Sequence, residues 1–367
     1  MKKVKKQYII PIFIPHLGCP NDCTFCNQKS ISGTQKMPTE DEVKNKIESD
    51  LKNFKEENAY IEIAFFGGSF TGIEQDLQEK YLSLAKEYVD NKKVDSIRIS
   101  TRPDYINKEI IKMLKKYGVK TIELGVQSTN DYILQRCERG HTFEDVKKAS
   151  KLIRWNRIKL GHQIMVGLPE STKLDELRCS RDIIKLKPKI VRIYPVLVIK
   201  GTKLESEYIN GEYTPLTVGQ AVERCKEMLY LFNKHNIEVI RIGLQNTEEI
   251  TDPKVKGSEV VAGPYHPAFG QLVEDSVWYD SISDKIKKIN VKVKEVKIKV
   301  NFADMNNVIG HKRENIKKIK EIYDVDVIVE ADNEIKQGKS ELEIVQTYDE
   351  YIEQVREKIK MWFVYKL

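Results

Sequence analysis

The sequence has no long hydrophobic run and few cysteines, and both absences exclude classes of protein. No stretch of the 367 residues approaches the roughly 18 consecutive apolar residues that a membrane-spanning helix needs. The apolar run at the N-terminus, from Tyr8 to Pro15, is short and contains two prolines, so it is expected to be a buried strand and not a signal peptide. The six cysteines are too few and too unevenly spaced for a secreted disulfide scaffold. We therefore expect a cytoplasmic protein that does not associate with a membrane.

Charge is distributed unevenly along the chain. Apolar residues make up 40% and charged residues 32%, a balance typical of a folded protein, and 367 residues allow two to three domains. Between Lys285 and Lys320, twelve Lys or Arg residues stand against three acidic residues, a local charge of +9 in a chain whose net charge is +7. The remaining residues therefore sum to −2. This concentration predicts a surface for a polyanion, and the alternative is a solvated helix face.

The first 245 residues alternate between short β-type runs and amphipathic helical stretches. Expected strands are Tyr8–Ile14, Tyr60–Phe66, Ser96–Ser100, Thr121–Gly125, Lys159–Val166, Ile190–Leu197 and Glu238–Ile242. Expected helices are Glu42–Phe54, Leu77–Val89, Glu109–Lys116, Phe143–Trp155, Leu174–Leu186 and Val218–His235. The repeated strand–helix units predict an α/β fold whose parallel sheet is open or curled into a partial (β/α) barrel. Its functional residues should lie on the loops that follow the C-terminal strand ends.

This alternation ends after residue 245. Residues 246–290 contain Gly263-Pro264-Tyr265-His266-Pro267, a loop-forming sequence, and we expect them to form a cap or connection. Residues 291–367 predict a separate small α+β domain with the element order β-α-α-β-β-α. The expected domains are therefore 1–245, 246–290 and 291–367.

Three of the six cysteines lie within eight residues and suggest a metal site. Cys19-x3-Cys23-x2-Cys26 follows the first expected strand, and Phe25 precedes the last cysteine. A closed zinc site needs a fourth ligand, which the nearby His16 could supply. A 4Fe–4S cluster held by three cysteines leaves one iron open to a substrate or cosubstrate. The other three cysteines are expected to be small buried apolar residues.

The cysteine spacing, with an aromatic residue before the third cysteine, resembles the cluster motif of the radical S-adenosylmethionine (SAM) superfamily. The resemblance implies that Cys19, Cys23 and Cys26 hold a 4Fe–4S cluster and that SAM chelates the open iron through its amino and carboxylate groups. It implies an enzyme in which an electron cleaves SAM to methionine and a 5′-deoxyadenosyl radical. A low-potential donor such as flavodoxin or ferredoxin is the implied source of that electron.

Turns after the later expected strands carry further motifs. They are Gly67-Gly68-Ser69-Phe70, Ser100-Thr101-Arg102-Pro103-Asp104-Tyr105, Gly125-Val126-Gln127-Ser128, Arg139-Gly140-His141-Thr142, Gly167-Leu168-Pro169-Glu170 and the stretch from Tyr194 to Thr202. Their order and spacing resemble the radical-SAM half of the Elongator catalytic subunit and, more distantly, oxygen-independent coproporphyrinogen oxidase.

The same resemblance implies roles for individual residues. The implied SAM contacts are Phe25, Gly67, Gly68, Ser69, Gln127, Arg139 and Gln163. Arg139 is expected to pair with the SAM carboxylate, a task suited to a guanidinium fork, while Gln127 and Gln163 bond the ribose hydroxyls. Ser100 stands where relatives often carry Glu. The candidate catalytic residues, which are expected to face the substrate, are Tyr194, Lys200, Tyr265 and His266.

The basic segment resembles an RNA-binding module. From Val308 to Ile319 the sequence is similar to the KH (K-homology) fold, in which a Gly-x-x-Gly loop between two helices clamps a single-stranded sugar–phosphate backbone. The implied RNA contacts are Gly310, Lys312, Arg313, Lys317 and Lys318. Arg313 stands in the place of the second glycine. The alternative is a packing domain with a basic surface.

Together these features predict an RNA-modifying radical SAM enzyme, with tRNA the first candidate substrate and ribosomal RNA the second. A flipped-out nucleotide would enter the mouth of the barrel. No acetyltransferase-like stretch follows the KH-like segment, so carboxymethyl transfer as in Elongator would need a partner that supplies acetyl-coenzyme A chemistry. Two alternatives remain open: a radical SAM enzyme that acts on a small molecule, and a non-catalytic RNA-binding protein with a structural zinc.

Overall fold

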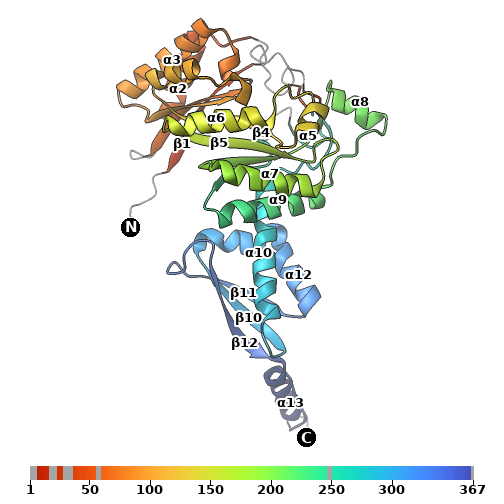
Figure 1. Ribbon diagram of the computed structural model, residues 1–367. Coiled ribbons are helices and arrows are strands. Elements are labelled where there is room, and N and C mark those ends of the chain that lie inside the picture. The colour runs from red at the N-terminus through yellow and green to blue at the C-terminus, as the bar shows by residue number, and fades with distance from the viewer. Residues whose placement is uncertain (1–5, 16–22, 28–35, 55–58, 246–249, 365–367) are drawn as a thin grey trace. The chain divides into compact units, whose positions relative to one another are not determined.

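The computed structural model describes residues 6–15, 23–27, 36–54, 59–245 and 250–364 (Figure 1). The chain divides into two compact units, Met1–Pro267 and Ala268–Leu367. Within the described residues, no helix combines the length and the apolar character that a membrane crossing requires.

The first unit is built on a seven-stranded sheet with the order β1-β2-β3-β4-β5-β6-β8. The strands are β1 Gln7–Ile14, β2 Tyr60–Gly67, β3 Ser96–Thr101, β4 Val119–Gln127, β5 Lys159–Val166, β6 Ile190–Pro195 and β8 Glu238–Ile242. Every neighbouring pair is parallel. The predicted α/β fold with a curled, partly closed parallel sheet is thus confirmed, and its strands lie close to the expected ranges.

Helices follow the strands of this sheet (Figure 1). They are α2 Glu40–Asn53, α3 Gln75–Asp90, α4 Lys108–Lys116, α5 Asp131–Arg136, α6 Phe143–Trp155, α7 Lys173–Leu186, α8 Lys203–Ile209 and α9 Val218–Lys234. Four of them (α2, α6, α7 and α9) begin at a threonine whose hydroxyl accepts a backbone N–H in a capping box. Each such cap stabilises its helix by about 1 kcal/mol. A short antiparallel pair, β7 Val198–Ile199 and β9 Val260–Ala262, completes the unit.

Alternate residues of the strands face the helices and form the core of the first unit. On β3 and β4 these are Ile97, Ile99, Ile122 and Leu124, all fully buried. Burying each such side chain contributes about 1.5–3 kcal/mol. The residues between them point to the opposite, concave face of the curled sheet, so the sequence alternation decides what lines the interior of the partial barrel.

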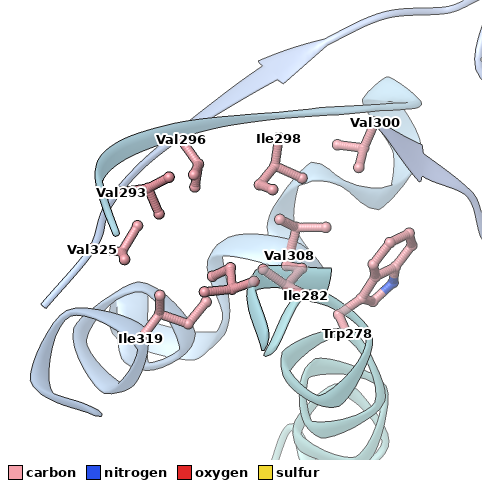
Figure 2. Packing of buried hydrophobic residues seen from close by; sticks show 10 residues of the cluster. Trp278, Ile282, Val293, Val296, Ile298, Val300, Val308, Ile319 and Val325 are labelled. Carbon is pink, nitrogen blue, oxygen red and sulfur yellow. The ribbon is translucent and has the colours of Figure 1, made fainter. Parts of the chain in front are cut away.

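The second unit is a three-stranded sheet covered by helices. Its elements are α10 Phe269–Lys287, β10 Val293–Val300, α11 Met305–Ile309, α12 Glu314–Tyr323, β11 Asp326–Ala331, β12 Ser340–Thr347 and α13 Tyr348–Val364. Strand β10 lies in the middle, parallel to β11 and antiparallel to β12. Figure 2 shows the apolar residues of β10 pointing toward Trp278 and Ile282 of α10. The expected order β-α-α-β-β-α is confirmed from residue 293 onward.

The expected cap over residues 246–290 differs from the structure. Strand β9 pairs with β7 inside the first unit, whereas α10 is a 19-residue helix of the second unit. Helix α10 is not apparent from the sequence pattern, because it buries Asp275 and Ser283 together with Val273, Trp278 and Ile282. Polar residues on the buried side break the apolar periodicity that identifies an amphipathic helix.

Candidate functional site

Arg139 reaches the cysteine motif although 116 positions separate them in the chain. Its Nη1 donates to Sγ of Cys23 at 3.4 Å, and its Nη2 donates to the Gly125 carbonyl at 2.9 Å. The side chain is buried, and its Nε has no hydrogen-bond partner within the described residues. No carboxylate of the described residues pairs with this guanidinium. A buried cation of this kind is unfavourable until an anion joins it, so the site is suited to a negatively charged group.

A bulge at the end of β4 turns Gln127 toward Arg139. The pairing of β4 with β5 shifts register between Gly125 and Gln127, and Gln127 has a φ of +66°, in the left-handed region. Its Oε1 is buried without a hydrogen-bond partner. A Cβ atom on Gly125 would lie 2.8 Å from Arg139 Nη2 and 3.2 Å from Gln127 Nε2. Bulges and left-handed residues are costly and cluster at ligand sites, where another contact offsets the strain.

His141 contacts the backbone of this bulge at Val126. Its Nε2 lies 3.3 Å from the Val126 carbonyl. Burial, together with the nearby Arg139 and Arg102 cations, lowers the pKa of His141 to about 3. The ring is therefore neutral at physiological pH, and one N–H is available to hold the carbonyl.

The Gly-Gly turn after β2 packs against the end of β1, just before the cysteine loop. Gly67 has a φ of +101°, and a Cβ atom there would lie 2.5 Å from the Ile14 carbonyl oxygen. The Gly68 N–H donates to that same oxygen at 2.7 Å. Ser69 is buried, with its hydroxyl 2.7 Å from the Thr101 hydroxyl, so it ties the turn after β2 to the turn after β3. Glycine is thus required at Gly67 by close backbone approach.

The described part of the cysteine motif is fixed from two sides. Thr24 receives a hydrogen bond at its carbonyl from Leu204 of α8, and its N–H donates to the Cys137 carbonyl. The Cys26 N–H donates to the Cys23 carbonyl at 2.9 Å. Phe25 packs on an apolar cluster that includes Cys137. Cys19 and His16 lie outside the described residues.

The four candidate catalytic residues have different surroundings. Tyr194 lies on the concave face of β6, where its hydroxyl accepts from Arg192 at 3.3 Å. Lys200 follows β7 and donates to the Ser258 carbonyl at 2.6 Å. Tyr265 packs against the apolar residues around β7 and β9, and His266 follows it on a partly exposed loop.

Comparison with known proteins identifies the family. Residues 13–177 match the model of the Radical SAM superfamily, and residues 188–278 match that of the Radical_SAM C-terminal domain. The chain belongs to the radical SAM superfamily. This confirms the family resemblance, and with it the cofactors, a 4Fe–4S cluster and SAM.

Several radical SAM relatives are similar over part of their length. A tRNA uridine(34) acetyltransferase of Methanocaldococcus jannaschii is 31% identical over 183 residues, which cover 44% of this chain and 34% of that protein. An uncharacterized protein of the same organism is 32% identical over 245 residues, which cover 62% of this chain and 74% of the relative. The structure of Elp3 from Methanocaldococcus infernus has the same fold, with a TM-score of 0.60 at 23% identity, and the match covers 79% of this chain and 67% of that one. The chain thus spans about a third of the length of the first of these relatives.

The residues at the strand ends fit the radical SAM cofactors. Cys23 and Cys26 lie on one tight turn, and neither forms a disulfide with a described residue. SAM carries a carboxylate, which suits the Arg139 guanidinium, because no carboxylate of the described residues pairs with it. SAM also carries hydroxyl and ammonium donors, which suit the Gln127 side-chain carbonyl, since that oxygen has no partner among the described residues. Membership of the radical SAM superfamily favours the 4Fe–4S cluster over a structural zinc site at the cysteine motif.

A charged network on the concave face of the radical SAM sheet was missed by the sequence analysis. Arg98 on β3 pairs with Glu62 on β2 and lies 2.8 Å from Glu123 on β4, and Glu123 also accepts from Arg192 on β6 at 2.5 Å. Arg98, Glu62 and Glu123 are almost fully buried. The signal was available, because parallel strands buried on both faces are normally apolar throughout, whereas Ile97-Arg98-Ile99-Ser100 alternates.

Gln163 lies on this same concave face. It pairs in register with Gly125 on β4 and with Arg192 on β6. The sheet therefore brings Gln163 close to the bulge that carries Gln127, and the two glutamines expected to contact SAM lie on neighbouring strands. Ser100, on β3, faces Glu123 in register and its hydroxyl has no partner within the described residues.

The loop between α11 and α12 of the second unit is tightly held. Gly310 has a φ of +79°, and a Cβ atom there would lie 2.8 Å from the Asn315 side chain. Asp275 of α10 accepts the His311 N–H at 2.7 Å. Lys312 and Arg313 both adopt left-handed conformations, with φ of +52° and +63°, and both are exposed. The left-handed region favours glycine, which is the residue that the predicted KH-like motif would have in place of Arg313.

The basic surface of this unit is smaller than the sequence indicated. Strand lysines pair with acidic residues that lie outside the Lys285–Lys320 window, as in Lys297–Glu330 at 2.9 Å and Lys299–Glu343 at 2.6 Å. Over residues 268–367, 18 basic residues face 19 acidic ones, a net charge of −1. At the loop end, Lys312, Arg313 and Lys318 form no ion pair with a described residue, and Lys317 has one acidic neighbour, Glu314, at 3.5 Å.

Proposed function

We propose that this radical SAM enzyme modifies a base in RNA, with tRNA as the substrate and ribosomal RNA as the second candidate. The observation that carries the proposal is the convergence of Arg139, Gln127 and Cys23 at the C-terminal strand ends, in a chain whose curated relatives include tRNA uridine(34) acetyltransferases. The protein would act in the cytoplasm with a low-potential electron donor such as flavodoxin or ferredoxin.

Each residue at the strand ends has a task in this proposal. Cys19, Cys23 and Cys26 hold the cluster, and Phe25 and the Gly67-Gly68-Ser69 turn border SAM. Arg139 binds the SAM carboxylate, and Gln127 and Gln163 bind its ribose hydroxyls. When bound, the cluster and SAM supply a 5′-deoxyadenosyl radical. The chain itself orients the cofactor and excludes water from the mouth of the barrel.

On the substrate side we assign Tyr194, Lys200, Tyr265 and His266 to the neighbourhood of the RNA base. Arg192 orients the Tyr194 hydroxyl by a hydrogen bond, and Glu123 orients Arg192. In the second unit, which we propose to be KH-like, Gly310, Lys312, Arg313, Lys317 and Lys318 hold the RNA backbone. The tight packing of Gly310 on Asn315 supports a preformed loop.

The test is SAM cleavage by anaerobically reconstituted protein with and without unmodified tRNA transcript, followed by mass spectrometry of the digested nucleosides. We expect tRNA to accelerate 5′-deoxyadenosine formation and one nucleoside to change in mass. SAM cleavage that no RNA accelerates, with unchanged nucleosides, would contradict the proposal and favour a small-molecule substrate.

A further inference from the structure

Helices α4 and α6 pack next to each other on the outside of the first unit and leave a groove between them. Its volume is about 400 Å³. The residues that line it are Lys108, Ile111, Lys112 and Lys115 from α4, Leu152 from α6, and Asn156, the C-cap of α6. Three lysines on one helix face thus border an open groove that no part of the site described above uses.

Basic residues outnumber acidic ones around the groove. Over residues 108–120 and 147–159 there are eleven Lys or Arg residues and one acidic residue, Glu109, a local charge of +10. In α6, Lys148, Lys151, Leu152 and Asn156 share one helix face, because they are three or four positions apart. Lys108, Lys112, Lys115, Lys148 and Lys151 are exposed, and none forms an ion pair with any described residue. Glu144 and Asp145 partly offset the charge of Lys148, but the lysines together still repel one another, so this surface is suited to an anionic partner.

An exposed tryptophan lies beside the residues that line the groove. Trp155, at the end of α6, is 72% exposed, and the Lys151 ammonium lies 4.4 Å from its ring centroid. It follows Leu152 by three positions and precedes Asn156, both of which line the groove. A large aromatic face in contact with water, bordered by lysines, is the arrangement on which nucleic-acid bases stack.

We propose that the α4–α6 groove is a second RNA-binding surface, in which lysines bind successive phosphates and Trp155 stacks on a base. Lys108, Lys112 and Lys115 span about 10 Å along the helix, at 1.5 Å per residue, a length that accommodates more than one phosphate of a strand. An acidic protein is the less suitable partner, since cores of protein–protein interfaces are depleted of lysine and this groove is dominated by it. The inference rests on the proposed function, because it names a further contact to the same RNA.

The experiment measures binding of unmodified tRNA transcript to the full chain at several salt concentrations. Each phosphate contact contributes about 0.7 to 0.9 to the slope of log affinity against log salt. Lys112→Glu with Lys148→Glu should therefore reduce the magnitude of the slope by about 1.4 to 1.8. Lys44→Glu with Lys52→Glu, on the exposed surface of α2, changes the net charge equally and should leave the slope unchanged. Equal slopes for the two double variants would overturn the proposal.

Trp155 provides an independent readout. Trp155→Ala should raise the Kd for tRNA about 5- to 150-fold, the usual loss for one stacked base. Binding of tRNA should also quench tryptophan fluorescence in the wild type and quench it much less in Trp155→Phe. If wild type binds tRNA and Trp155→Phe shows the same quenching, the groove is not an RNA site, and the proposed function stands. If the wild type binds no RNA, the proposed function fails as well. If the groove variant binds tRNA normally but is no longer reduced by flavodoxin, the surface serves a protein partner and the inference is wrong.

Discussion

Alanine at position 125 should disrupt the SAM site without disturbing the sheet. The added Cβ atom would lie 2.8 Å from Arg139 Nη2 and 3.2 Å from Gln127 Nε2, while the nearest backbone atom beyond its neighbours, the Thr101 oxygen, is 3.8 Å away. Both close contacts are side-chain ends, so the strand is retained and the two side chains move. Arg139 then loses its 2.9 Å hydrogen bond to the Gly125 carbonyl and its alignment with the site.

The expected loss of SAM affinity equals the free energy of one hydrogen bond from the Arg139 guanidinium. A hydrogen bond from a charged group contributes about 1.5–3 kcal/mol, so Gly125→Ala should raise the Kd for SAM roughly 10- to 150-fold. The assay is equilibrium binding of SAM to anaerobically reconstituted protein, with iron and sulfide content measured in the same samples. Gly219→Ala is the matched control, because a Cβ atom there meets nothing within 4 Å. If Gly125→Ala holds a full cluster and binds SAM as tightly as the wild type, Arg139 and Gln127 do not contact SAM.

Three further perturbations have defined outcomes. Cys23→Ala with Cys26→Ala should abolish iron binding, while the helix content measured by circular dichroism stays unchanged. The control is Cys225→Ala, which replaces a buried cysteine of α9 and should keep the iron. Iron retained in the first variant would refute the cluster assignment. The pKa of His141 is about 3 in the folded state and lies below its value in the unfolded state. The unfolded state therefore takes up a proton that the folded state excludes, and the unfolding free energy falls as the pH drops from about 6.5 toward 3. His141→Gln should reduce the slope of the unfolding free energy against pH in that window by up to about 1.4 kcal/mol per pH unit. If this slope is unchanged, the imidazole of His141 is not held neutral by burial. Arg313→Gly should raise the unfolding free energy of the chain by about 1 kcal/mol, because it relieves a left-handed non-glycine residue, yet weaken tRNA binding; tighter binding would mean that Arg313 makes no phosphate contact.

Several features of the fold followed from local sequence patterns because they depend on neighbouring residues. The strand Lys159–Val166 and the helix Phe143–Trp155 were predicted with their observed ends, since apolar periodicity and a threonine cap operate over a few residues. Helix α10 was not predicted, because Asp275 is buried there by its contact with the loop at His311, 36 positions away. A buried carboxylate looks like a solvated one until its distant partner is known.

The sequence by itself determined the chemistry of this protein, and the tertiary structure decided how that chemistry is assembled and where charge is exposed. The spacing of Cys19, Cys23 and Cys26 indicated the family, because the cluster motif that it resembles lies within eight residues and can be recognised from the sequence. The contact of Arg139 with Cys23 and the bulge at Gln127 required the sheet, which aligns the ends of strands that are far apart in sequence. The distribution of exposed charge also depended on the tertiary structure. The basic segment from Lys285 is largely neutralised by acidic residues on the neighbouring strands. The lysines of α4 and α6 form one surface only because the two helices pack together. Electrostatic potential depends on distances in space, and a linear count of charges does not contain them.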